Sequence, residues 1–406
     1  MDTRSTDIAI AGGGLAGGLI ALALARACPQ LSLAVFEGGA TLGGNHRWSW
    51  FDSDLDEAGT ALMSPFVTTA WDKGYDVAFP KYRRTLTSTY RSLASPDFHS
   101  ALIEELDGQQ IALGAKIASL DANSVTLANG ERHEARVVID CRGFEPTPHL
   151  KGGWQVFLGQ HFHLPEPHGE ERPVIMDASV DQHAPHGNMG AYRFVYTLPL
   201  GERDIFLEDT YYADDPALDR SALSGRIASY ASALGWQGEL VGEETGVLPV
   251  MTGGDFDAYQ RSVRIPGVAV AGARGGFAHP LTSYTLPVAV ETALAIAEWA
   301  SSQGSALNGV ALADLLEKRA RRQWRRTGFY RLLARMLFFA GEPEKRFAIF
   351  QRFYRLPEPL IERFYAGNTS LGDRVRILSG KAPVSIPSAI KALAKSGTPL
   401  TTEKPA

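Results

Sequence analysis

The sequence predicts an α/β fold with three parts: a Rossmann-type nucleotide-binding domain, an inserted and mostly antiparallel β-sheet domain, and a C-terminal helical segment. Three observations support this fold class. Residues 7–37 have the pattern of strand, glycine turn, helix and strand. Residues 151–264 change to alternating strands and turns, including the hairpin signal "YRFVYTLPL-GER-DIFLEDTYY". Residues 265–304 return to a buried strand and a long apolar helix.

The predicted division of the chain follows these changes of pattern, and its 406 residues are long enough for two domains. The predicted parts are a discontinuous nucleotide-binding domain (1–75, 96–150 and 265–304), a substrate-binding β-sheet domain (76–95 and 151–264), a basic helical region (305–380) and a tail rich in Pro, Ser, Thr and Lys (381–406).

The stretch "AGGGLAGG" places Gly12, Gly14 and Gly17 in G-x-G-x-x-G register between a strand and a helix. Glu37 ends the next strand, twenty residues after Gly17. In this context the motif is the dinucleotide fingerprint: the glycines allow the turn, the approach of a pyrophosphate and close packing of the helix. The phosphates would lie at the helix N-terminus, and Glu37 would accept hydrogen bonds from an adenosine ribose. A carboxylate there argues against a 2′-phosphate, and so against NADP in this site.

A second motif decides between FAD and NAD. The late stretch "GVAVAGARGGFAHPLTSYTLPVAVETA" resembles the second flavin motif of FAD proteins, in which a glycine pair at a strand end leads to a helix beneath the flavin. Many such proteins carry Asp after the first glycine, where this chain has Ala273 and Arg274. No second G-x-G-x-x-G is present, so we expect no dedicated nicotinamide domain. The residues expected to contact FAD are Gly12, Gly14, Gly17, Glu37, His46, Gly272, Arg274, Gly276 and Thr282.

Composition and charge limit the class of protein. Cys28 and Cys141 are far apart and lack metal-type spacing, which argues against a metal site or disulfide framework and favours a reducing cytoplasm. Residues 8–25 are 18 uncharged residues, but their glycines and the acidic segment before them argue against a membrane span or signal peptide. The formal net charge is −5, whereas residues 318–363 contain 13 Lys and Arg against four Glu.

The stretch "RDIFLEDTYY" contains an acidic pair in an apolar strand. Strand alternation places Phe206, Glu208 and Thr210 on one face, and Asp209 on the other. Glu208 is either an exposed strand carboxylate or an acid whose pKa burial among aromatic side chains has raised.

Eight segments together resemble the bacterial lycopene β-cyclase family. They are "GGNHRWSWFDSDL", "GWQVFLGQHF", "PVIMDASVDQ", "YRFVYTLPL", "IFLEDTYY", "GEETGVLPV", "GARGGFAHPLTSYTLP" and "RFYRLPEPLIERFYAG". Arg47 stands where Thr is usual in that family, and Trp50 where Phe is usual. The resemblance implies cyclisation of the linear ends of lycopene to β-ionone rings, giving γ-carotene and then β-carotene. It also implies reduced FAD, regenerated from NAD(P)H without net redox change, and a catalytic acid at Glu208, with Asp209 second.

Three other residues lie in or near these motifs. For His279 a structural hydrogen-bonding role is favoured over proton transfer, and for Asp177 the two readings stay open. His46 is expected at the flavin or the substrate channel.

The basic helices after residue 318 alternate Arg with aromatic and aliphatic residues. Phe329, Leu332, Leu333, Met336 and Leu337 follow helical spacing. They form either a helical cap on the core or a surface that docks to anionic lipid. Lycopene dissolves only in membranes, which favours peripheral attachment at the inner face of the cell membrane. We expect neither nucleic acid nor a metal as partner.

Two rival functions remain at this point. A flavin monooxygenase or isoprenoid reductase would consume NAD(P)H in step with product. A flavin-stabilised carrier of apolar ligands would not need Glu208.

Overall fold

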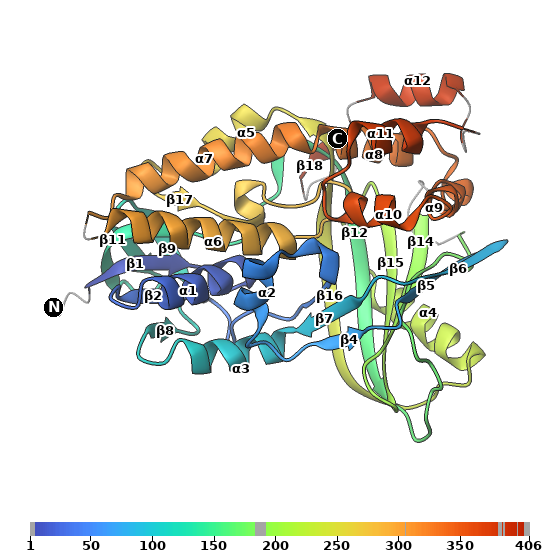
Figure 1. Cartoon of the computed structure of the whole chain (residues 1–406), viewed down its shortest axis with the longest axis horizontal. Helices are drawn as coiled ribbons and strands as arrows, with labels where there is room; N and C mark the ends of the chain where they lie inside the picture. Colours follow the sequence, from blue (N-terminus) through green and yellow to red (C-terminus); the bar gives the residue numbers. More distant parts are fainter. Residues whose placement is uncertain are drawn as a thin grey trace.

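The computed structural model describes residues 5–182, 192–304, 306–380, 384, 386–395 and 397–401. Figure 1 shows a molecule with the N-terminal sheet at one end and the C-terminal helices at the other. The long strands of the second sheet lie at the same end as the C-terminal helices. The predicted fold class is confirmed, because a mixed Rossmann-like sheet and a mostly antiparallel sheet are both present.

The first sheet is the Rossmann-like one. β1 pairs in parallel with both β2 and β11, as its continuous run of buried apolar residues predicts. In sheet order its strands are β8 (Gln110–Ala112), β2 (Leu33–Phe36), β1 (Ser5–Ala11), β11 (Arg132–Asp140), β10 (Ser124–Leu127) and β9 (Ile117–Asp121), with β17 (Ala269–Val270) beside β11.

Helices cover one face of this sheet. Ile8 and Ile10 of β1 belong to a core shared with α1 and α6, whereas Ala9 and Ala11 face a smaller cluster with β9 and β10. The helices that contribute to the core on this face include α1 (Leu15–Ala27), α2 (Glu57–Met63), α3 (Ser95–Glu105) and α6 (Leu286–Gln303).

The second sheet contains the predicted hairpin, which is confirmed. β14 pairs antiparallel with β15, with Tyr196 opposite Glu208. The strands in order are β16 (Glu239–Gly254), β12 (Thr147–His163), β15 (Asp204–Ala213), β14 (Tyr192–Pro199), β13 (Val174–Asp177), β5 (Tyr75–Phe79) and β6 (Tyr82–Leu86). α4 (Arg220–Ala233) contacts β12 and β15.

Residues 76–95 are divided between two sheets. β5 and β6 belong to the second sheet. The third sheet contains β3 (Arg47–Phe51), β7 (Tyr90–Ala94) and β4 (Thr69–Trp71). The boundaries of the predicted domains stay a prediction. β3 belongs to the predicted nucleotide-binding part, and it carries Arg47 toward the second sheet.

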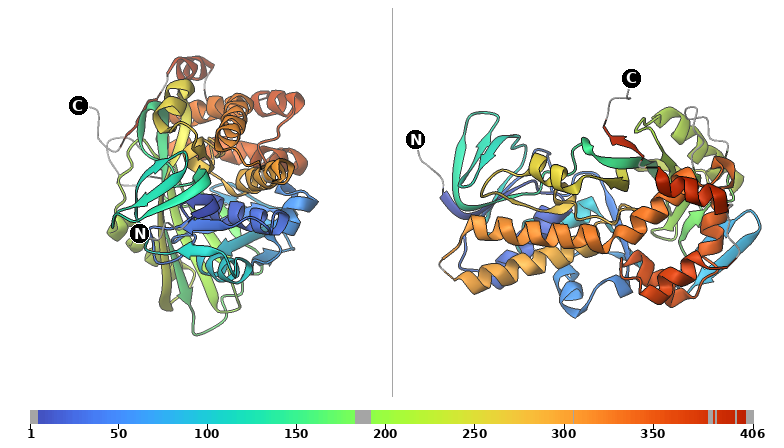
Figure 2. Two further views of the ribbon diagram at one scale, coloured as in Figure 1. Left: turned by 90° about the vertical axis from the view of Figure 1, so that its left-hand side faces the viewer. Right: turned by 90° about the horizontal axis from the view of Figure 1, so that it is seen from above.

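The helices after α7 (Gly309–Arg326) gather at the end of the molecule away from the N-terminus, whereas α7 runs beside α6 toward them (Figure 2). They break at the glycines and prolines that the sequence marks as helix ends. The helices after α7 are α8 (Gly328–Phe339), α9 (Phe347–Phe353), α10 (Glu358–Tyr365), α11 (Leu371–Leu378) and α12 (Ile386–Ala394).

The expected tail after residue 381 differs from the structure. Within it, α12 packs on α8, and β18 (Thr398–Leu400) pairs with the start of β12. Ala392 and Leu400 are fully buried, so this segment is held by apolar contacts that its polar composition hides.

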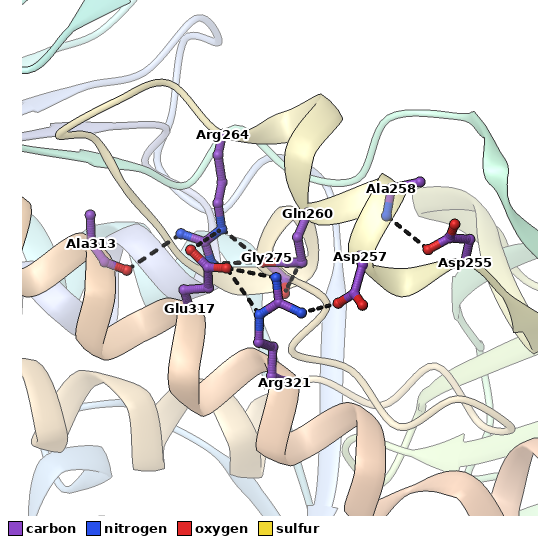
Figure 3. Close-up of polar contacts among 9 residues, drawn as sticks. All are labelled: Asp255, Asp257, Ala258, Gln260, Arg264, Gly275, Ala313, Glu317 and Arg321. Carbon is purple, nitrogen blue, oxygen red and sulfur yellow. Dashed lines mark hydrogen bonds and ion pairs between the residues drawn. The ribbon is translucent and has the colours of Figure 1, made fainter.

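Arg319 and Arg321 of α7 form ion pairs within the protein. Figure 3 shows Arg321 on α7 bonded to Glu317 and to Asp257 of α5 (Phe256–Val263). Arg264 donates to Gln260 and to the carbonyl of Ala313. These contacts fix α5 against α7.

The basic residues of α8 are also engaged inside the protein. Arg331 is buried, lies over the Trp324 ring at 3.6 Å from its centroid, and donates to the Thr327 hydroxyl. Arg335 donates to the carbonyl of Thr252 on β16 at 2.7 Å. Both arginines therefore hold the helical region to the core.

Candidate active site

The glycine turn has the geometry that its sequence predicts. Gly12 has φ +99°, and a Cβ there would lie 2.7 Å from the carbonyl oxygen of Cys141. A Cβ at Gly17 would lie 1.9 Å from the carbonyl oxygen of Gly12, so the helix packs closely on the turn. Gly14, the N-cap of α1, has open space where its Cβ would be. The helix N-terminus thus presents an open cradle of the kind that a pyrophosphate fills.

Glu37 lies at the end of β2 and closes this turn. Its carboxylate accepts hydrogen bonds from the amides of Gly13, at 2.8 Å, and Gly39, at 2.7 Å. A single carboxylate oxygen accepts more than one hydrogen bond, so these contacts orient Glu37 and leave acceptor capacity for a ribose.

The second motif folds into a short 3₁₀ helix, Gly272–Gly275, against the first. Gly272 has φ +61°, and a Cβ there would lie 2.8 Å from the Cβ of Ala16 on α1. Arg274 is buried and forms ion pairs with two carboxylates, Asp140 at 2.9 Å and Glu145 at 3.0 Å. Its guanidinium therefore joins the motif to the end of β11.

α5 holds the same loop from outside. Tyr259 donates to the carbonyl of Arg274 at 2.7 Å. Figure 3 shows Gln260, which donates to the carbonyl of Gly275. Gly276, with φ +86°, ends the 3₁₀ helix. The loop is thereby fixed from both sides.

A tight turn leads from this loop into α6. The His279 Nδ1 accepts from the amides of Leu281 and Thr282, at 3.4 and 3.2 Å. Burial lowers the pKa of His279 to about 3, so the ring is neutral and its role here is structural. Ser283 has φ +58°, a conformation uncommon outside glycine, and its hydroxyl donates to the carbonyl of Pro249.

The first residues of α6 and the turn before it line a cavity of about 230 Å³, here called the acid cavity. Glu208 lines the same cavity, and so do His46, Arg47 and Thr282. Its aromatic walls come from Trp48, Tyr90, Phe157, Tyr196, Phe206 and Tyr284. The positive end of the α6 dipole therefore points into the space that Glu208 faces.

Burial raises the pKa of the Glu208 carboxyl well above its ordinary value. The Thr210 hydroxyl, which donates to Oε1 at 2.5 Å, and the Arg47 charge act in the opposite direction, while the Asp209 charge adds to the rise. The balance favours a protonated acid near neutral pH, held in one orientation by Thr210.

A second cavity of about 270 Å³, here called the apolar cavity, lies between the second sheet and the C-terminal helices. It shares Gln155, Tyr196, Thr282 and Tyr284 with the acid cavity, so the two adjoin. Its helical wall includes Leu333, Met336, Leu337, Ile349, Phe350, Phe353, Phe364, Tyr365, Ile377, Leu378, Ala389, Ile390 and Leu393. The apolar stripe of α8 that the sequence singles out thus contributes to this lining through Leu333, Met336 and Leu337.

Asp209 lies on the opposite face of β15 from Glu208. It is fully buried, and the Arg193 guanidinium holds it at 2.6 and 2.9 Å. The structure does not bring Asp209 to the acid cavity. Asp177 is similarly engaged: it accepts from Tyr230 at 2.9 Å and from Ser179 at 2.5 Å.

Three features of the site are absent from the sequence prediction. Glu244 is a buried carboxyl in the row of Glu208. The Gln155 Oε1 is buried and has no hydrogen-bond partner among the described residues. The C-terminal helices line a cavity and do not merely cap the core. Only the first had a local signal, in the "GEETGVLPV" segment.

These features define the class of protein by its fold. A putative FAD-containing monooxygenase from Photorhabdus luminescens is similar, with a TM-score of 0.53, 13% identity, and coverage of 81% of this chain and 97% of that one. A geranylgeranyl bacteriochlorophyll reductase-like protein from Thermoplasma acidophilum has a TM-score of 0.58 at 11% identity, covering 97% and 99%. The chain has the α/β fold of FAD-dependent monooxygenases.

The family follows from sequence similarity. The family model described as "Lycopene cyclase protein" matches residues 7–391. A lycopene beta-cyclase of Pseudescherichia vulneris is 46% identical over 387 residues, which are 95% of this chain and 96% of that protein. The chain therefore belongs to the lycopene cyclase family, and the resemblance drawn from its motifs is confirmed.

Proposed function

We propose that the protein is a lycopene β-cyclase that closes the linear ends of lycopene to β-ionone rings by acid catalysis. One observation carries the proposal. Glu208, whose pKa is raised by burial, lines the acid cavity with its aromatic walls, and that cavity adjoins the apolar cavity. The apolar cavity suits a hydrocarbon chain, and the acid cavity suits its reacting end. Family membership gives the same substrate class.

The residues of the acid cavity perform three tasks. Glu208 gives a proton to the terminal double bond, and the resulting cation closes the ring before a different proton leaves. The faces of Tyr196, Phe206 and Trp48 stabilise the cation by roughly 0.5–2 kcal/mol each. The closely packed apolar walls exclude water, which would otherwise trap the cation as an alcohol.

FAD is the proposed cofactor, and the residues present fit it. The open cradle at Gly14, the oriented Glu37 and the α6 N-terminus at the acid cavity lie where a diphosphate, a ribose and a flavin edge require them. When bound, reduced FAD would supply negative charge beside the cation, and NAD(P)H would serve as the external reductant without net consumption. Gln155, whose Oε1 accepts no hydrogen bond from the part of the chain that the structure describes, offers an acceptor at the junction of the cavities.

The reaction type is tested by anaerobic incubation in D₂O with lycopene in liposomes, FAD and NADPH. We expect a pigment isomeric with lycopene apart from incorporated deuterium, and NADPH use that does not scale with turnover. A mass change of one oxygen or two hydrogens, matched by NADPH consumed, would mean a monooxygenase or reductase. Binding of lycopene with no change in mass would mean a carrier.

The protein is further proposed to take lycopene from a membrane surface at the mouth of the apolar cavity. No helix among the described residues is long and apolar enough to span a bilayer. Leu371, Val375 and Leu378 share one face of α11 and are exposed, as are Ile390 and Leu393 of α12. Leu378, Ile390 and Leu393 also line the apolar cavity.

Basic side chains accompany this apolar surface. Arg376 of α11 and Lys391 of α12 are exposed, and so is Lys395, which directly follows α12. Each Lys or Arg near an anionic membrane contributes about 1 kcal/mol of binding. The docking surface is therefore placed on α11 and α12, because the arginines of α8 are engaged inside the protein.

The double variant Leu371→Asp/Val375→Asp should bind anionic liposomes about tenfold or more weakly, since each substitution removes an inserting apolar side chain. Leu371 and Val375 are 78% and 67% exposed, so the fold should be unaffected. Liposome flotation measures the binding. Val67→Asp is the control, because Val67 is 72% exposed but lies outside α11 and α12. This variant should bind liposomes as the wild type does. Equal binding by the double variant would move the docking surface elsewhere.

A further inference from the structure

The row of residues that crosses the second sheet at Glu208 contains a second buried carboxyl. Gly159 of β12 pairs with Glu208 of β15 on one side and with Glu244 of β16 on the other. Residues directly opposite in antiparallel strands project to the same face, so both carboxyls lie on the face of the acid cavity. At about 4.8 Å per strand, their Cα atoms are about 10 Å apart, a gap that two glutamate side chains largely span.

Glycine at position 159 leaves room for an aromatic ring between the two carboxyls. A Cβ at Gly159 would lie 2.2 Å from the Cζ of Phe206, so that ring occupies the place of a side chain. The Arg47 guanidinium lies over the same ring, with its Cζ 5.4 Å from the centroid. Arg47 is therefore held next to the row, and its charge acts on both Glu208 and Glu244.

We propose that Glu208, Glu244 and Arg47 form one charge unit that holds a single proton near neutral pH, with Glu244 as the positioning residue that keeps Glu208 protonated and Arg47 as the positioning residue that balances the remaining charge of the pair. This inference deepens the proposed function and rests on it. Two buried carboxylates beside one guanidinium would leave an uncompensated negative charge, whereas one proton makes the unit neutral. Burial and the mutual repulsion of the carboxyls raise the pKa of Glu244 as well.

The unit returns to its starting state in every cycle. Glu208 gives its proton to the double bond, which forms a C–H bond and leaves a carbocation. Ring closure moves the cation, and loss of a different proton from carbon forms the new double bond. When that proton returns to the carboxyl pair, atoms and electrons balance and no reductant is consumed.

Other titratable groups interact electrostatically with the unit. They are Tyr90, Asp97, His161, Tyr196 and, from the other face of β15, Asp209. Burial raises the pKa of both tyrosines and lowers that of His161, so these three are neutral near pH 7. Asp97 is exposed, and Asp209 is paired with Arg193 on the other face.

The test compares Glu244→Gln with Arg47→Thr by the pH dependence of kcat/KM for lycopene. Activity requires protonated Glu208, so it falls as pH rises through the pKa of Glu208. Glu244→Gln removes a like charge, lowers that pKa, and should move the alkaline limb down by about one pH unit. Arg47→Thr removes an opposite charge, raises that pKa, and should move the limb up. Misfolding would not move the alkaline limbs of the two variants in opposite directions.

A second readout does not depend on activity. Infrared titration of the carboxyl C=O band in the full-length protein as purified should show two coupled steps in the wild type and one fewer in Glu244→Gln. Asp54, whose pKa burial raises to about 7, titrates in the same range but is common to all variants, so difference spectra remove it. Unshifted limbs, limbs shifted in the same direction, or an unchanged infrared titration would each overturn the proposal. If the wild type failed to cyclise lycopene, the infrared result would still decide on the charge unit.

Discussion

Replacing Glu208 by Gln should reduce cyclisation by on the order of 10²- to 10⁴-fold, because the amide cannot give a proton to the double bond. The amide is of nearly equal size and can still accept the hydrogen bond from Thr210. Bound FAD should be retained, since none of the nucleotide-cradle contacts involves Glu208. Pigment analysis measures the loss, and flavin absorbance of the purified protein measures retention.

The matched control is Glu202→Gln, which changes an exposed carboxylate in the turn of the same hairpin. It should cyclise lycopene at the wild-type rate. A near-normal yield of β-carotene from Glu208→Gln would remove Glu208 from the chemistry. Loss of FAD in that variant would mean that the cavity had collapsed.

Replacing Asp209 by Asn should destabilise the protein by about 3–5 kcal/mol, because it leaves the Arg193 guanidinium buried without its counter-charge. Asp209 is fully buried and Arg193 is 7% exposed, so water cannot compensate. Chemical denaturation measures the loss of stability. Asp204→Asn, on the same strand but 36% exposed at its side chain, should cost at most about 1 kcal/mol.

A double variant separates stability from catalysis at this position. Arg193→Met/Asp209→Leu replaces the ion pair by apolar groups, and such replacements recover much of the lost stability. We expect this variant to fold and to cyclise lycopene, which would assign Asp209 to the core. A folded but inactive double variant, with FAD bound, would restore the catalytic role that the acidic pair suggests in the sequence.

The parts of the site that the sequence predicts are those set by local pattern. The glycine register fixes the turn at Gly12 and Gly17 because no other residue fits those contacts. Period-two alternation separates Glu208 from Asp209, and the structure places them on opposite faces. Glu244 could not be placed in the same way, because its approach to Glu208 depends on the register of β12 between two strands distant in sequence.

The helical region is a second case in which the local sequence pattern does not predict the structure. Its arginines resemble a basic surface in sequence, yet Arg331 and Arg335 are held by carbonyls and an aromatic ring. Composition also predicts a tail after residue 381, because two short elements with one fully buried residue each, Ala392 and Leu400, carry little periodic signal. Both the placement of these arginines and the packing of α12 and β18 depend on tertiary contacts, which the local sequence pattern does not show.

The pairing of β18 with the first residues of β12 has a consequence for the order of folding during synthesis. Thr398–Leu400 are synthesised long after β12, and α12, just before them, supplies one wall of the apolar cavity. Until α12 has been made, the apolar side chains of α8 and α9 that line this cavity lack that wall. A nascent chain would therefore expose these side chains during synthesis, and a chaperone, or the membrane itself, would be needed to cover them.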